Sequence, residues 1–268
     1  MLFSGSFHFH SLFLFLTPRS ADLCGSIESI QKPYFADCPL TSCHFSCPLK
    51  DSLRSNRLRD LDRVIIFDQE MRGIVVELDL AVTAARCLCN GENGIDPCKL
   101  RSSLTSIEYT LLSRTYTDSG RELCRLGLVV LVATLISEMP QGRTPGCNNL
   151  WIRIRELLRE QENATVPFGH AGQYEPIDVQ LLVEFRLWMM FLAAGGIADD
   201  QLSLKNWYLS AIATTATSLL ENLHISWNDI EPRVTSFLFV PAIHGRIFEY
   251  TWERSREFVP IEPCPYLA

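Results

Sequence analysis

The stretch from Phe185 to Phe258 decides the fold: FRLWMMFLAAGGIADDQLSLKNWYLSAIATTATSLLENLHISWNDIEPRVTSFLFVPAIHGRIFEYTWERSREF. Its first part is an apolar run, Leu187–Ala194, which two glycines follow. Nowhere does it alternate apolar and polar residues between turn signals, as a strand of a sheet would. The pattern predicts four helices: Ile177–Ala194, Leu202–Leu223, Asp229–Phe239 and Pro241–Phe258.

Four more helices are predicted upstream of this stretch. The first begins near Leu58, where apolar residues start to recur at spacings of three, four and seven, and it ends after Cys89. Asp96 and Pro97 are a typical N-cap and first residue for the second. A third starts around Asp118, runs through Met139 and is closed by Pro140 and Gly142; it is apolar on nearly every side, so we expect it to be central. The fourth covers about Asn149–Glu162.

The predicted fold is therefore all-α, a single multi-helix domain of about eight helices over residues 59–268. Residues 1–58 differ from the rest, since they mix Ser, Pro, Cys and His without a lasting period. Pro33, Pro39 and Pro48 exclude a long helix through this segment. We expect 1–58 to be a poorly ordered, irregular leader.

The composition narrows the class of protein. The chain has 268 residues, of which 47% are hydrophobic, and its formal net charge of −7 argues against a nucleic-acid-binding surface. No run of 18 apolar residues occurs, so no transmembrane helix is expected. The short apolar run Ser11–Leu16 lacks a preceding positive segment, which disfavours secretion. Most of the ten cysteines are expected to be small buried residues in a reducing compartment.

The C-terminal stretch resembles the regulatory region of the fungal zinc-cluster transcription factors. The resemblance rests on the apolar helix with its small-residue turn, an aromatic-initiated helix, a W-x-x-I segment, a Phe/Leu-rich helix and a terminal Trp. These features are Leu187–Ala194, Gly195–Ala198, Trp207-Tyr208, Trp227–Ile230, Phe237–Phe239 and Trp252. The likeness extends weakly back to about residue 62. It implies a nuclear, helical regulatory domain that acts through protein partners and is not an enzyme.

The zinc cluster of that family is missing from this chain. The cluster needs C-x-x-C pairs and basic residues between them. Here Cys38, Cys43 and Cys47 are separated by four and three residues, with almost no Lys or Arg among them. Together with His44 they make a poor zinc site, so we expect no metal and no direct DNA binding by this chain alone.

Other short motifs favour structural roles. Gly195-Gly196 lacks the remaining residues of a phosphate-binding loop, and we expect it to end a helix and reverse the chain. Asp199-Asp200 fits the N-terminus of the next helix. Cys87 and Cys89 cannot chelate a metal from one helix, because residues two apart point in different directions.

No catalytic constellation is evident. His170, His224 and His244 are isolated from any nucleophile motif, so no catalytic residue and no cofactor is predicted. The arginines at 54, 57, 59 and 63 alternate with aspartates, and a solvated helix entry with local ion pairs explains them better than a DNA-contacting arm.

The aromatic residues of the C-terminal helices are the natural lining for an effector, or else simply the core. The candidates are Trp188, Met189, Phe191, Trp207, Trp227, Phe237 and Trp252. We expect Trp188, Trp207 and Trp227 to be buried. Alternatives to a regulatory, partner-binding domain are a helical enzyme or small-molecule carrier without a sequential motif, or a secreted helical protein; a cytoplasmic location is the alternative to a nuclear one.

Overall fold

In the computed structural model of the protein, the described residues are 26, 27, 29, 31–33, 57–92, 94–137, 148–163, 176–220 and 225–258. Helix accounts for about 82% of the structure, and the described part contains no strand, which confirms the all-α prediction. The elements are α2 (Arg57–Asp60), α3 (Asp62–Ile65), α4 (Gln69–Cys89), α5 (Pro97–Leu112), α6 (Ser119–Ser137), α7 (Asn148–Asn163), α8 (Pro176–Gly196), α9 (Leu202–Leu220), α10 (Trp227–Val234), the π-helix η1 (Pro241–Gly245), α11 (Arg246–Ser255) and the 3₁₀-helix η2 (Arg256–Phe258).

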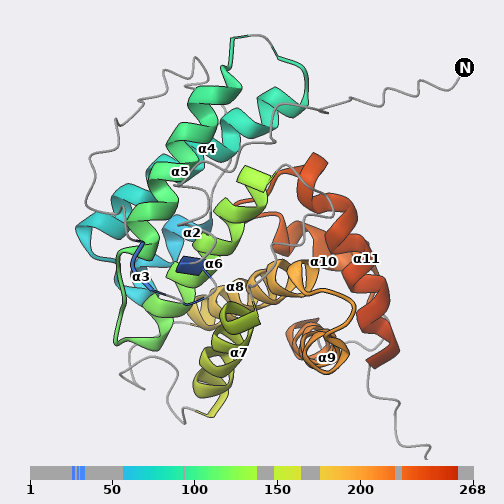
Figure 1. Ribbon diagram of the computed structural model, residues 1–268. Helices are drawn as coiled ribbons and strands as arrows, with labels where there is room; N and C mark the ends of the chain where they lie inside the picture. Colours follow the sequence, from blue (N-terminus) through green and yellow to red (C-terminus); the bar gives the residue numbers. More distant parts are fainter. Residues whose placement is uncertain are drawn as a thin grey trace, which may run out of the picture.

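Two helices, α6 and α8, pack against each other in the middle of the molecule (Figure 1). The α4–α5 hairpin lies on one side of them, while α9, α10 and α11 surround α8 on the other. Every residue from Glu122 to Val132 of α6 is buried, as the sequence predicted for this helix. Gly127 of α6 faces Met189 of α8, whose thioether occupies the space of the missing Cβ, so the glycine lets the two helices approach closely.

Carboxylates cap the two helices of the hairpin. Asp68 accepts a hydrogen bond from Met71 N at 2.7 Å, which caps α4, and Asp96 accepts one from Cys98 N at 2.9 Å, which caps α5. Each cap satisfies one of the backbone donors that a helix leaves free at its start. The predicted role of Asp96, with Pro97 at the first helical position, is confirmed.

The predicted first helix is broken into α2, α3 and α4. Ile66, with φ 52°, ends α3 in the left-handed region, which is rare for a β-branched residue. The Asp62 carboxylate accepts the Phe67 N–H at 2.7 Å and an Arg72 hydrogen bond at 2.6 Å. Because this side chain and the Asp68 cap satisfy the backbone donors locally, the helix can stop and restart here.

Part of the expected leader belongs to the helical body. Leu58 is fully buried, and Ser26, Ile27 and Pro33 are buried as well. Ile27 and Leu58 pack in the hydrophobic core, although they fall within the expected leader. Most other residues of 1–58 lie outside the described ranges.

The predicted helix from Asp229 to Phe239 is wrong at both ends. The Ser226–Asp229 capping box starts α10 earlier, at Trp227, and the helix ends at Val234. Beyond it, the Leu238 carbonyl accepts the Trp188 indole N–H at 3.2 Å, and the Phe239 carbonyl accepts Arg86 Nε at 2.6 Å. Side chains from distant helices thus replace the hydrogen bonds that a longer helix would have made.

The diglycine ends α8, as the sequence predicted. Both glycines are the last helical residues of α8, and neither has a positive φ; among the described glycines only Gly91 and Gly94 do. Both positions need a residue without a Cβ. A Cβ on Gly196 would lie 2.6 Å from the Trp151 ring, and one on Gly195 would lie 2.6 Å from Ile247.

By length and composition one described helix, over Val179–Gly196, could cross a membrane, although the sequence analysis expected none. Two-thirds of this window (67%) is buried inside the protein, and it contains Glu184 and Arg186. Burial of this kind is typical of the central helix of a globular domain.

Candidate functional site

Five of the seven candidate lining residues form the solid core of the C-terminal half. They are at most 2% exposed: Trp188, Met189, Phe191, Phe237 and Trp252. Among them, Trp188 stacks on Phe237 at 5.6 Å between ring centroids. These side chains therefore stabilise the packing of α8 against the segments that follow it.

Trp207 and Trp227 are only half-buried, which corrects the expectation that both would be inside. Trp227, at the start of α10, contacts Phe191 at 5.9 Å between centroids. Trp207, on α9, meets Tyr208 edge-on at 4.9 Å, and the guanidinium of Arg159 lies over its ring at 5.2 Å. Trp207 thus combines an exposed aromatic surface with a cation from another helix.

The surface around Trp207, hereafter the α7–α9 face, consists of Arg155, Arg159, Trp207 and the buried Tyr208 beneath them. The Tyr208 hydroxyl donates to the Trp151 carbonyl of α7 at 2.7 Å, and this burial raises the pKa of Tyr208. Arg155 lies within electrostatic reach of the same hydroxyl. Its Nε is buried and has no hydrogen-bond partner.

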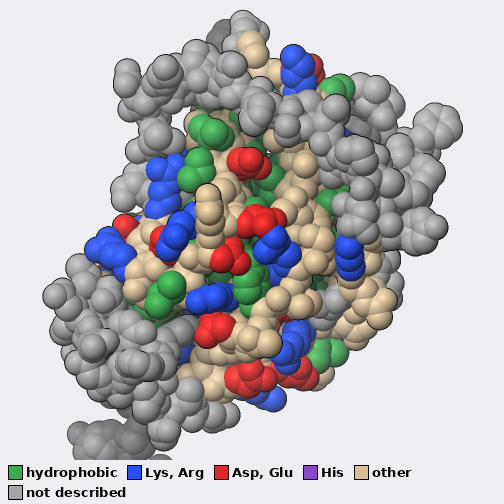
Figure 2. Space-filling view, turned by 90° about the vertical axis from the view of Figure 1, so that its left-hand side faces the viewer, with side chains coloured by type: hydrophobic (Ala, Val, Ile, Leu, Met, Phe, Trp, Pro, Cys, Tyr) green, Lys and Arg blue, Asp and Glu red, His purple; other side chains and the backbone are tan. Residues whose placement is uncertain are grey.

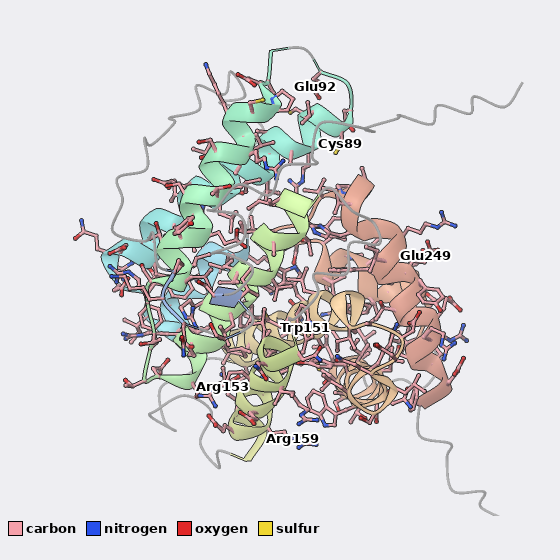
Figure 3. The ribbon with its side chains drawn as sticks, viewed as in Figure 1. Cys89, Glu92, Trp151, Arg153, Arg159 and Glu249 are labelled. Carbon is pink, nitrogen blue, oxygen red and sulfur yellow. The ribbon has the colours of Figure 1, made fainter. Side chains whose placement is uncertain are left out.

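The two arginines of this face lack a carboxylate partner in the part of the chain that the structure describes. Arg155 and Arg159 are four residues apart and share one side of α7. Arg153 lies on a different side of the helix, where it pairs with Glu156 at 3.3 Å and Glu160 at 3.6 Å. Figure 3 shows Arg153 and Arg159 at the outer surface of α7, and Trp151 farther inside.

Helix α9 brings no negative charge to the face. Lys205 is its one charged residue, and this side chain bonds Asp199 at 2.6 Å. Asp199 and Asp200 lie in the turn just before α9, and Gln201 directly precedes its first helical residue, Leu202. The Lys205–Asp199 pair is a local neutralisation, and it leaves Arg155 and Arg159 as net positive charges.

Elsewhere in the molecule, buried carboxylates form ion pairs that join helices. Glu184 of α8, which is 1% exposed, pairs with Arg57 of α2 and with Arg233 of α10, the latter at 2.5 Å. Burial next to Arg233 lowers the pKa of Arg57, although Asp60 opposes that shift. Arg57, which was expected in a solvated strip with local pairs, instead has a partner 127 residues away on α8.

A second buried ion pair lies where α6 meets α5. Glu122 and Arg125 pair at 2.6 Å in the interior, and Arg125 donates to the Leu111 carbonyl at 3.0 Å in the last turn of α5. Glu122 also accepts the Tyr116 N–H at 3.1 Å. Polar groups are therefore used here to satisfy a buried helix end.

On the opposite part of the surface, charges of both signs alternate. The side of the molecule where α3 lies carries intermixed Lys/Arg and Asp/Glu side chains (Figure 2). Three pairs contribute: Arg63–Asp60, Arg72–Asp62 and Arg114–Glu70. Arg63–Asp60 is the local i,i+3 pair that the sequence analysis expected.

His244 and Glu108 are titratable groups that are buried without an ion-pair partner among the described residues. His244 Nδ1 accepts the Val240 N–H at 3.0 Å, so the ring is neutral with its proton on Nε2, which contacts the Thr134 hydroxyl at 3.1 Å. Burial and the nearby Arg86 lower the pKa of His244 to about 3. Burial raises the pKa of Glu108 on α5 to about 8. His170 and His224 lie outside the described residues.

The cysteine expectations have a mixed outcome. Cys87 is buried and Cys89 is exposed, as predicted for a core and a surface cysteine on one helix. Within the described ranges no group of three or more His, Cys, Asp or Glu residues is placed to hold a metal. Cys38, Cys43, Cys47 and His44 lie outside those ranges.

Comparison with known proteins gives no relative. No protein-family model, no curated protein and no solved structure matches this chain. The arrangement of the α7–α9 face is therefore the basis for its chemistry. Two guanidinium groups and an indole face can hold an oxyanion beside an apolar group by charge-assisted hydrogen bonds and stacking.

Proposed function

We propose that this chain is a helical regulatory domain of the fungal transcription-factor type, which acts by binding a protein partner and has no zinc cluster of its own. The resemblance in residues 185–258 suggests the class and a nuclear location. The observation that supports partner binding is the Arg159–Trp207 pair, in which a half-exposed indole lies under an arginine from another helix. Trp and Arg are among the residues that carry most of the binding energy in protein interfaces.

Arginines inside the protein and arginines on the α7–α9 face differ in their ion pairing, and this difference supports the proposal. The buried carboxylates Glu184 and Glu122 hold helices together, and their arginine partners are occupied. Arg155 and Arg159 form no ion pair with any other described residue. Charges that contribute little to the fold, placed beside an exposed aromatic ring, favour recognition of another molecule.

A tethering assay tests this function. The full chain is fused to a heterologous DNA-binding domain and expressed in a fungal host that carries the matching reporter gene. We expect transcription to change at least threefold relative to the DNA-binding domain alone. A fusion that is folded, nuclear and bound to the reporter, yet leaves transcription unchanged, would contradict the proposal.

A further inference from the structure

The geometry points to the chemistry of the partner: we propose that the α7–α9 face binds an acidic peptide segment, with carboxylates on Arg155 and Arg159 and an apolar side chain against Trp207. This inference rests on the proposed function, because it assumes that a protein partner binds. It goes further by assigning the surface and the class of side chains that the surface recognises.

The first argument is charge. Arg155 and Arg159 each carry a positive charge. Their Cβ atoms are about 5–6 Å apart, as those of residues four apart on a helix are. Within the described part of the chain, neither forms an ion pair, while the neighbouring Arg153 pairs with Glu156 and Glu160. A partner with two carboxylates at similar spacing would complete the charge balance that the protein itself leaves open.

The second argument is the buried donor. Arg155 Nε is shielded from solvent and has no acceptor among the described residues. A buried N–H without a partner loses its hydration without gaining a hydrogen bond. Arg155 as a whole residue is half-buried, so part of it is open to an incoming carboxylate.

The third argument is the aromatic surface. Trp207 is half-buried, contacts Tyr208 edge-on, and already has a guanidinium over its ring. Beneath this ring, the hydrogen bond from the Tyr208 hydroxyl to the Trp151 carbonyl joins α9 to α7. A rigid indole next to two cations suits an acidic segment that carries an apolar anchor.

A nucleic acid fits this face less well. A phosphate backbone needs a continuous track of Lys and Arg, and this face offers only Arg155 and Arg159 without an ion-pair partner among the described residues. The overall negative charge does not exclude an acidic peptide. At physiological ionic strength charges farther away than about 8 Å are largely screened, so the local arginines decide binding.

Selection from a random 12-residue peptide library displayed on phage is the test, with the full folded chain as bait. The same selection is run on Arg155→Gln/Arg159→Gln and on a control with the same charge change, Arg153→Gln/Arg63→Gln. Peptides selected on the unmodified chain are synthesised with a fluorescent label, and their Kd is measured by anisotropy at two salt concentrations. Circular dichroism verifies that each variant is folded.

We expect selected peptides with an excess of Asp and Glu and at least one large apolar residue. Their affinity should fall at least tenfold in Arg155→Gln/Arg159→Gln and less than twofold in the control, and Gln in place of the peptide carboxylates should have the same effect as the double variant. The inference would be overturned by selected peptides that have no excess of Asp and Glu, or that bind Arg155→Gln/Arg159→Gln as tightly as the control variant. In either case the proposed partner binding would stand. A library that yields no reproducible binder would count against both. Tight binding of a labelled oligothymidylate that depends on the two arginines would overturn the acidic-peptide assignment in favour of single-stranded nucleic acid.

Discussion

The indole N–H of Trp188 on α8 donates to the backbone carbonyl of Leu238, fifty residues further along the chain, at 3.2 Å. This bond holds a buried, non-helical segment against the central helix. Phe237 in the same segment stacks on the Trp188 ring, so one side chain supplies both a donor and a packing surface.

Removing this side chain should destabilise the fold strongly. Trp188→Ala should lower the free energy of unfolding by about 3–5 kcal/mol, since it opens a cavity in a filled core. Trp188→Phe keeps most of the volume but leaves the Leu238 carbonyl unpaired, at a cost of about 1–3 kcal/mol. Chemical denaturation measures both, with Trp207→Phe as the half-exposed control. Melting of Trp188→Ala within a degree or two of the parent would show that this packing is wrong.

Two glycine substitutions should have opposite signs. A Cβ on Gly196 would lie 2.6 and 2.8 Å from two atoms of the rigid Trp151 ring, so Gly196→Ala should destabilise by about 1–3 kcal/mol. Gly73 in α4 has nothing within 4 Å of its Cβ position, so Gly73→Ala should stabilise by about 0.4–1 kcal/mol. Thermal melts of the two variants provide the comparison. Equal shifts of the same sign would contradict the contact between α8 and α7.

Glu108 should make stability depend on pH. Burial raises its pKa from 4.5 to about 8, so the folded state holds the neutral acid while the unfolded chain ionises. The stability that this group contributes is therefore present below pH 4.5 and is lost as pH rises towards 8. Glu108→Gln should be close to the parent at pH 4.5 and more stable at pH 8.5, by on the order of 2–4 kcal/mol. Denaturation at both pH values checks this, and a difference that does not change with pH would rule it out.

His244 should stay neutral through the physiological range. Its pKa is lowered from 6.5 to about 3, so its contribution to stability is complete above pH 6.5 and is lost as pH falls towards 3. Nitrogen NMR should show an unprotonated Nδ1 that does not titrate between pH 8 and 5. Thr134→Val removes the acceptor for Nε2–H and should cost about 1–3 kcal/mol. An imidazole that titrates near pH 6.5 would mean that the ring is exposed.

Local signals in the sequence account for much of the fold. The Asp96-Pro97 start, the stop after Cys89 and the central position of α6 follow from capping chemistry and apolar periodicity, which act over a few residues. The break at Ile66 was missed because it depends on Asp62 and Asp68 side chains turning back to the backbone. The end of α10 was missed because its replacement hydrogen bonds come from Trp188 and Arg86, far away in sequence.

The candidate site was harder to predict. Trp188 lies inside an apolar run, whereas Trp207 follows Lys205 and Asn206, a polar pair that was given too little weight when Trp207 was expected to be buried. Arg57 and Arg155 also look alike as charges on a wet helix face. Arg57 pairs with the buried carboxylate of Glu184, 127 residues away, whereas Arg155 Nε has no hydrogen-bond partner among the described residues. Neither outcome follows from local spacing.

The central claim is that regulation acts through the α7–α9 face, and the tethered reporter tests it most directly. The measurement is reporter transcription with Arg155→Gln/Arg159→Gln compared with the charge-matched Arg153→Gln/Arg63→Gln, both verified as folded, nuclear and bound to the reporter. The account predicts that the first variant loses most of the transcriptional effect and that the control keeps it. Equal activity of the two variants would contradict the claim.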